Sequence, residues 1–128
     1  MIISRILVIG AGGFVGAVAR HVLGGLVQHR VGGFFPSGTL AVNVIGCCLM
    51  GALLTVVEER QALGPDARMF LAVGILGSFT TFSTFGYETM ELIRTGSTRM
   101  AAVNVAANVV VGLVALWVGR TIARALVT

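Results

Sequence analysis

Hydroxyl and phenyl side chains alternate in one apolar stretch of the sequence, GILGSFTTFSTFGYE at residues 74 to 88. Hydroxyl groups donate hydrogen bonds, and the edges of phenyl rings carry positive potential, so both can face a small anion. No acidic side chain lies at the middle of this stretch, which argues against a cation or proton path. The pattern favours a dehydrated anion pathway; the alternative is that the rings fill space and the hydroxyls bond to their own helix.

The spacing of these residues assigns them to two helix faces. Phe82 and Phe85 would share one face at 3.6 residues per turn, and Ser83 and Thr84 would share a neighbouring one. Glycines precede them, and nearby hydroxyls can bond to freed backbone groups, which is how a membrane helix tolerates a break. We expect a break near residues 77 to 80, where unwound carbonyls could hold a small cation and polar donors a small anion.

Few other polar side chains interrupt the apolar stretches, and each has two readings. Asn43 carries an amide that can donate two hydrogen bonds, either to an anion or to a neighbouring helix. Arg20 either snorkels to the membrane surface or attracts an anion. Asn104 and Asn108 lie one turn apart on one helix face, for which a helix-to-helix contact is the favoured reading.

The elements that position these residues follow from composition. Of 128 residues, 56% are apolar and only 11% are charged, whereas about a quarter are charged in a soluble domain. This predicts an all-α integral membrane protein, with residues 1–128 forming a single transmembrane domain. A hydrocarbon core needs about 20 helical residues per span. Four stretches meet that need: residues 3–27, 38–57, 67–93 and 99–125.

The arginines show almost no bias between the two membrane sides. The N-terminus, the second loop and the C-terminus share one side, which holds Arg5, Arg60, Arg68, Arg120 and Arg124. The other side holds Arg20, Arg30, Arg94 and Arg99. A clear excess normally fixes orientation, so this chain could insert both ways up. Since four helices are too few to wall a polar pathway alone, we predict an antiparallel, dual-topology homodimer.

Two other patterns mimic known sites. Gly10, Gly12 and Gly16 nearly match a dinucleotide-binding signature, but the third glycine is one place late and no acidic residue follows at the required distance. Gly12 and Gly16 instead suit close packing of membrane helices. Cys47 and Cys48 are adjacent and would point about 100° apart on a helix, which favours neither a disulfide nor a metal site.

Three segments resemble the Fluc, or CrcB, fluoride channels: GGFVGAVAR at 12–20, GTLAVNVIGCCLMG at 38–51 and GILGSFTTFSTFGYET at 74–89. The resemblance covers the first three spans closely and the fourth in length and hydrophobicity. It implies an antiparallel homodimer with two narrow pores that passively exports fluoride from a prokaryotic cell through the inner or plasma membrane. It implies neither an enzyme nor a nucleic-acid-binding protein.

The resemblance also implies roles for single residues. Phe82 and Phe85 would meet the ion with their edges, and Asn43 would donate beside them. Ser83 and Thr84 would belong to a hydroxyl track. Arg20 and Glu88 would lie towards the pore mouths, and the carbonyls of Gly77 and Thr80 would bind a central structural sodium ion shared by both subunits.

Two other functions remain open on the sequence alone. A small drug exporter of four helices needs a membrane-buried carboxylate, normally in the first helix, and the first span has Arg20 and no acid. A structural subunit that does not conduct is the second alternative. Catalysis is disfavoured because no nucleophile and base are placed together by spacing.

Overall fold

The computed structural model describes residues 1–61 and 63–127, and those residues form helices and connecting turns. The elements are α1 (Ile2–Val31), α2 (Ser37–Arg60), α3 (Pro65–Arg68), η1 (Met69–Leu76), α4 (Gly77–Phe79), α5 (Phe82–Arg94), α6 (Thr98–Ala106), η2 (Ala107–Val111) and α7 (Gly112–Val127). They make four spans that are long and apolar enough to cross a membrane: Ile2–Val31, Ser37–Arg60, Pro65–Arg94 and Thr98–Val127. The predicted all-α class and the four spans are confirmed.

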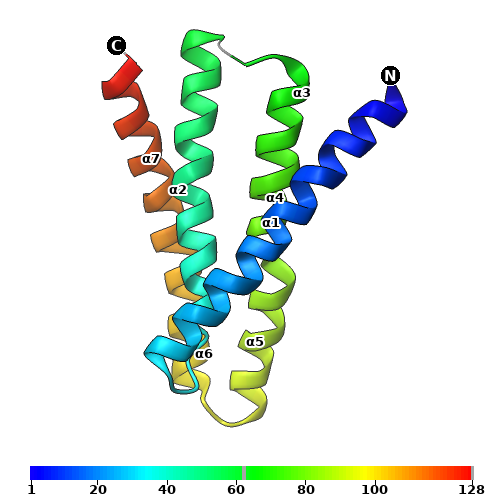
Figure 1. The fold of residues 1–128 in the computed structure, drawn as a ribbon. Coiled ribbons are helices and arrows are strands. Elements are labelled where there is room, and N and C mark those ends of the chain that lie inside the picture. Colours follow the sequence, from blue (N-terminus) through cyan, green and yellow to red (C-terminus); the bar gives the residue numbers. More distant parts are fainter. Residues whose placement is uncertain (62, 128) are drawn as a thin grey trace.

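The four spans cross between two ends of the molecule (Figure 1). Both termini and the α2–α3 connection lie at one end, while the α1–α2 and α5–α6 connections lie at the other. Helix α2 packs along α7, and α1 runs obliquely across α2, η1 and α4. The arginine groups that the sequence assigns to the two sides fall at opposite ends except for Arg20, which lies about three turns inside α1.

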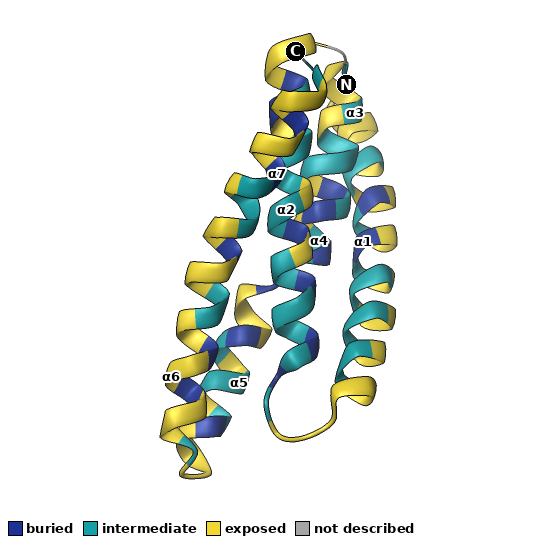
Figure 2. Cartoon of the chain, turned by 90° about the vertical axis from the view of Figure 1, so that its left-hand side faces the viewer, coloured by how far each residue is buried: buried dark blue, intermediate teal, exposed yellow. Residues whose placement is uncertain are grey.

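Burial is confined to narrow stripes where the helices meet (Figure 2). The buried positions include many small residues, and large apolar side chains face outwards, such as Phe14 at 73% exposed and Trp117 at 65%. An apolar exterior is what a bilayer requires, because lipid tails are as apolar as leucine.

Glycines allow α1 to approach the third span closely. A Cβ added at Gly16 would collide with the carbonyl oxygen of Ile75, and one at Gly12 would lie 2.5 Å from the carbonyl oxygen of Phe70. Neighbouring backbone cannot move aside as a flexible side chain can, so these positions accept only a hydrogen atom. The packing role predicted for Gly12 and Gly16 is confirmed.

The same device joins α2 to α7. A Cβ at Gly51 would collide with the carbonyl oxygen of Leu116, and a Cβ at Gly119 would collide with that of Cys48. At the terminal end of this contact, Arg120 pairs with Glu58 at 3.3 Å and Arg124 with Glu59 at 2.9 Å.

The third span bends where α4 meets α5. Thr80 and Thr81 have extended backbone conformations, with φ and ψ of −87° and 158° and of −151° and 119°. The sequence predicts a break near residues 77 to 80, and the bend lies at the end of that range. The hydroxyl of Thr81 accepts a hydrogen bond from the amide of Thr84 at 3.2 Å, so it caps the N-terminus of α5.

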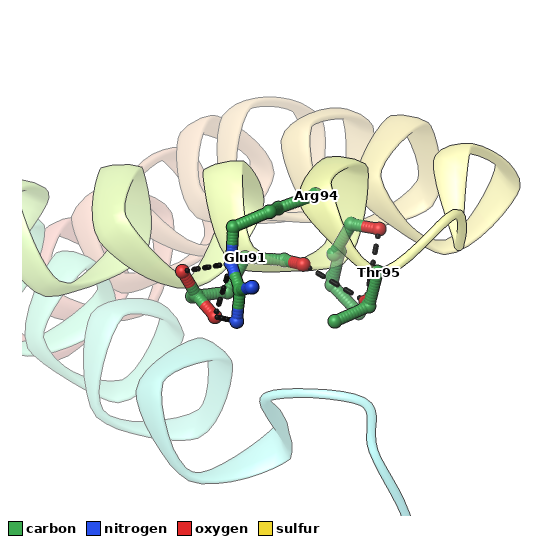
Figure 3. A network of polar contacts seen from close by, with 4 residues as sticks. Glu91, Arg94 and Thr95 are labelled. Atoms are coloured by element: carbon green, nitrogen blue, oxygen red, sulfur yellow. Dashed lines mark hydrogen bonds and ion pairs between the residues drawn. The ribbon is translucent and has the colours of Figure 1, made fainter.

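Two other local features shape the second half of the chain. Helix α5 ends in a surface cluster in which Arg94 donates to the Glu91 carboxylate from Nε at 3.0 Å and from Nη2 at 2.8 Å (Figure 3). Gly96, with φ of 82°, then turns the chain into α6. In the fourth span, η2 is a π-helical turn that includes Asn108, and such turns are frequent at functional sites.

Candidate functional site

Asn43 on α2 pairs with the backbone of Thr81 at the bend. Its Oδ1 accepts the Thr81 amide hydrogen at 2.8 Å, and its Nδ2 donates to the Thr81 carbonyl at 3.1 Å. Extended backbone inside a membrane must find partners because lipid supplies none. The side chain of Asn43 therefore satisfies both backbone hydrogen-bonding groups of Thr81. Its second N–H donates to Oδ1 of Asn108 at 2.9 Å.

Phe82 and Phe85 meet edge to face beside this amide. Their ring centroids lie 5.3 Å apart with an interplanar angle of 60°. Phe85 is buried, whereas Phe82 is 81% exposed on the single chain. Both rings line a hollow of about 240 Å³, whose walls are Asn43, Cys47, Thr80, Thr81, Phe82, Phe85, Asn108 and Val109. The structure thus brings the predicted rings and the predicted amide to one hollow.

A second hollow, of about 350 Å³, also has Thr81 in its wall. Its walls are Arg20, His21, Gly24, Gly25, Gln28, Gly38, Thr39, Val42, Thr81, Thr84 and Glu88. Thr39 donates its hydroxyl hydrogen to Oε1 of Glu88 at 2.8 Å. Oε2 of Glu88 is buried and has no hydrogen-bond partner among the described residues. Thr81 lines both hollows, so it stands between them.

Arg20 lies deeper than the sequence analysis places it. The predicted first span ends at residue 27, but α1 continues to Val31, so Arg20 is about three turns from the helix end. Its Nη1 makes a long hydrogen bond of 3.5 Å to the carbonyl oxygen of Thr80. The guanidinium group therefore brings positive charge to the bend itself.

Ser83 and Thr84 lie on the first turn of α5, where hydroxyl groups cluster around Thr81. Oγ1 of Thr81 donates to Oγ1 of Thr84 at 3.0 Å and lies 3.4 Å from Oγ of Ser83. Both predicted hydroxyl residues are exposed on the single chain. Thr84 lines the hollow that holds Arg20, whereas Ser83 lines neither of the two hollows.

The carbonyls of Gly77 and Thr80 suit a hard cation in part. The amide of Thr81 donates to Asn43 and not to Gly77, so the Gly77 carbonyl loses its usual helical donor. Released carbonyls of this kind coordinate sodium in membrane proteins. The guanidinium of Arg20 beside the Thr80 oxygen opposes a cation, and one chain supplies only these two predicted oxygens, so a complete site would need further ligands.

The structure also supplies partners that sequence reasoning missed. The sequence predicts neither the pairing of Asn43 with Thr81 nor the contact of Asn43 with Asn108. Asn108 is held in turn by Asn104, which is fully buried. The sequence does hold a signal for this cluster. Asn43 in the second span and Asn104 and Asn108 in the fourth fall at about the same depth in the membrane as the expected break in the third span.

The sequence matches the model of the family described as CrcB-like protein, Camphor Resistance (CrcB), over residues 7–120. The chain belongs to the CrcB family. This match reaches into α7, so the resemblance seen in the first three spans is confirmed and extends into the fourth.

Curated relatives carry one common name. A fluoride-specific ion channel FluC of Geobacter sulfurreducens is 45% identical over 123 residues, which cover 96% of this chain and 99% of that protein. The FluC of Nitratidesulfovibrio vulgaris is 42% identical, covering 91% and 94%. FluC 3 of Methanosarcina barkeri is 40% identical, covering 92% and 89%. The CrcB-family chain is thus a multi-pass membrane protein whose relatives are named ion channels and not enzymes.

Proposed function

We propose that this chain is a fluoride channel that exports fluoride passively from a prokaryotic cell. The names of its relatives support fluoride as the transported ion, because those relatives align with nearly the whole chain at 36–45% identity. The observation that carries the proposal is the hollow beside the bend, where the Asn43 amide and the edge-to-face pair of Phe82 and Phe85 meet.

The ion's route would connect the two hollows. Fluoride would enter near Arg20 and Glu88, pass the hydroxyls of Ser83 and Thr84 around Thr81, and reach the rings. Positive charge on Arg20 attracts an anion into a cleft with low-dielectric walls. Fluoride is strongly hydrated, so hydroxyl, amide and ring-edge donors must replace its water while still letting the ion leave.

The proposal includes an antiparallel homodimer with two pores. Phe82 is 81% exposed on the single chain, although it would wall the pathway, so a second copy is needed to cover it. With Arg20 at the bend, the two ends hold five and three arginines, and this small difference supports insertion in both orientations. The helix break proposed for the third span would lie where the two copies meet.

A sodium ion at the dimer centre completes the proposal as a structural element. The Gly77 and Thr80 carbonyls of two copies would provide four oxygens, which relieves the shortage of ligands in one chain. The exposure of Gly77 on the single chain is consistent with such sharing. We expect the thermal unfolding midpoint of the purified dimer to fall when sodium is replaced by N-methylglucamine, a cation too large for the site; an unchanged midpoint would remove sodium from the proposal.

Fluoride efflux from liposomes tests the proposed function. Purified protein in liposomes loaded with fluoride or with chloride should release fluoride rapidly and retain chloride. Phe82→Ile removes the ring edge and Asn43→Ala removes the amide, so both should slow fluoride release. Phe14→Ile is the matched control, since Phe14 is 73% exposed on α1 and lines neither hollow.

The outcomes separate conduction from folding. Size-exclusion chromatography of each variant shows whether it remains a folded assembly. If the folded native protein releases no fluoride, the channel proposal fails, and a structural subunit becomes the better reading. If Phe82→Ile and Phe14→Ile release fluoride equally fast, the ion does not pass the Phe82 ring.

A further inference from the structure

The amide of Asn43 makes two hydrogen bonds that fix its orientation and a third whose acceptor can be exchanged. Two hydrogen bonds to the backbone of Thr81, at 2.8 and 3.1 Å, fix its orientation. Those bonds use Oδ1 and one of the two N–H groups. The second N–H donates to Oδ1 of Asn108 at 2.9 Å and can change partner without turning the amide.

Asn108 presents an acceptor to the hollow because its own donors are used elsewhere. Its Nδ2 donates to the backbone carbonyl of Asn104 at 3.0 Å and to Oδ1 of Asn104 at 3.0 Å. Asn104 is 0% exposed and donates to Oγ1 of Thr89 at 3.0 Å. Thr89 donates to the carbonyl of Phe85 at 2.7 Å. The bond to the Asn104 backbone carbonyl sets which end of the Asn108 amide faces Asn43, and the rest of the relay links this pair to α5.

The position of Asn108 makes its oxygen a rival to an anion. Asn108 lines the same hollow as Asn43, Phe82 and Phe85. Its Oδ1 carries lone pairs, as fluoride does, and both are acceptors for the same N–H. An anion that binds to Asn43 therefore has to displace Asn108 first.

We propose that Asn108 sets the fluoride affinity of the hollow by competing with the ion for the second N–H of Asn43. The inference rests on the proposed function and concerns one residue within it. Asn108 is then a specificity-determining acceptor and neither a ligand of the ion nor a simple helix contact. A rival acceptor weakens binding, and a conducting site must bind weakly enough to release its ion.

Asn108→Leu is the variant that removes the rival oxygen at similar side-chain volume. It leaves both bonds between Asn43 and Thr81 in place and frees the second N–H of Asn43. Thr89→Val is the matched control, because it cuts the far end of the same relay while Asn108 still faces Asn43. Initial rates of fluoride efflux from liposomes, measured across a range of fluoride concentrations, give a half-saturating concentration and a maximal rate for each protein.

The half-saturating fluoride concentration and the maximal rate should both fall, a combination that partial misfolding would not produce. In Asn108→Leu the half-saturating fluoride concentration should fall by about three- to tenfold, as expected for one hydrogen bond regained by the ion. The maximal rate should fall as well, because the ion leaves more slowly. Thr89→Val should keep its half-saturating concentration within about twofold of the native protein. A folded Asn108→Leu protein with an unchanged or raised half-saturating concentration would overturn the inference.

A measurement on the native protein covers the case in which Asn108→Leu does not fold. Asparagine labelled with ¹⁵N gives side-chain amide resonances that Asn43→Gln and Asn108→Ser variants assign. Added fluoride should shift one of the two Asn43 amide protons far more than the other, and chloride at the same concentration should shift neither. Equal shifts of both protons, or none at saturating fluoride, would contradict exchange at one N–H.

Failure of the inference is distinct from failure of the proposed function. A native protein that releases no fluoride would refute the channel itself. A native protein that conducts fluoride, with an Asn43 or Asn108 response other than that described, would leave the channel standing and refute only the competition.

Discussion

The contact between α2 and α7 permits a quantitative test of glycine packing. In Gly51→Ala the new Cβ would lie 3.0 Å from the carbonyl carbon of Leu116 and 3.1 Å from the amide nitrogen of Arg120, and closer still to the Leu116 oxygen. All three are backbone atoms, so no side-chain rotation relieves the overlap. The helices must separate by about 1 Å to restore ordinary contact distances.

The expected cost follows from that separation. Overpacking typically costs about 1–3 kcal/mol, and the better helix propensity of alanine returns up to about 1 kcal/mol. Since Gly10→Ala gains the same helix propensity without overlap, we expect Gly51→Ala to have a free energy of unfolding about 1–3 kcal/mol below that of Gly10→Ala. Gly119→Ala meets Cys48 backbone atoms at 2.8 and 3.1 Å at the same crossing and should cost a similar amount.

The double variant Gly51→Ala with Gly119→Ala tests whether the two methyl groups strain the same contact between α2 and α7. Once the first methyl group has separated the helices, the second one needs little further movement, so the two costs should be less than additive by about 0.5 kcal/mol or more. Denaturant titration in mixed micelles, followed by the fluorescence of Trp117 on α7, measures each free energy. Gly10→Ala is the control, since nothing lies within 4 Å of its added Cβ. Equal stability of Gly51→Ala and Gly10→Ala would refute the packing argument.

Three further predictions use the same titration. Thr81→Val removes the acceptor for the Thr84 amide and should cost about 0.5–2 kcal/mol; native stability would show that the cap contributes nothing. Asn104→Leu removes the side-chain oxygen that accepts from Asn108 and the donor to Thr89, while the backbone carbonyl of residue 104 still accepts from Asn108; the loss should cost about 1–3 kcal/mol, a result that a neutral variant would contradict. Glu58→Gln breaks a pair with Arg120 in which both side chains are about half exposed, so solvent screening should keep the change within about 0.5 kcal/mol; a larger loss would mean that the pair is shielded from solvent.

The sequence was sufficient for the features that depend on local composition. Span number and approximate limits followed from apolar length, because a bilayer core demands about 20 apolar residues whatever the neighbours are. The bend was expected at residues 77 to 80 from glycines and hydroxyls, and it lies at Thr80 and Thr81.

Features that depend on neighbouring helices could not be predicted from the sequence. Asn43 and Thr81 are 38 residues apart, and only the packing of α2 against the third span brings the amide to the extended backbone. The depth of Arg20 depended on where α1 ends, and polar residues after position 27 continue that helix. Asn108 lies in a π-helical turn, which the residues around it do not predict.

The shared end of the two termini limits how copies of this chain can be joined. Four crossings return the chain to the side on which it started, so a short linker between two copies can give only a parallel pair. The proposed antiparallel pair would require a linker that itself crosses the bilayer, which means an added helix of about 20 apolar residues. A fused gene that worked would therefore have to encode an odd number of crossings between its two halves.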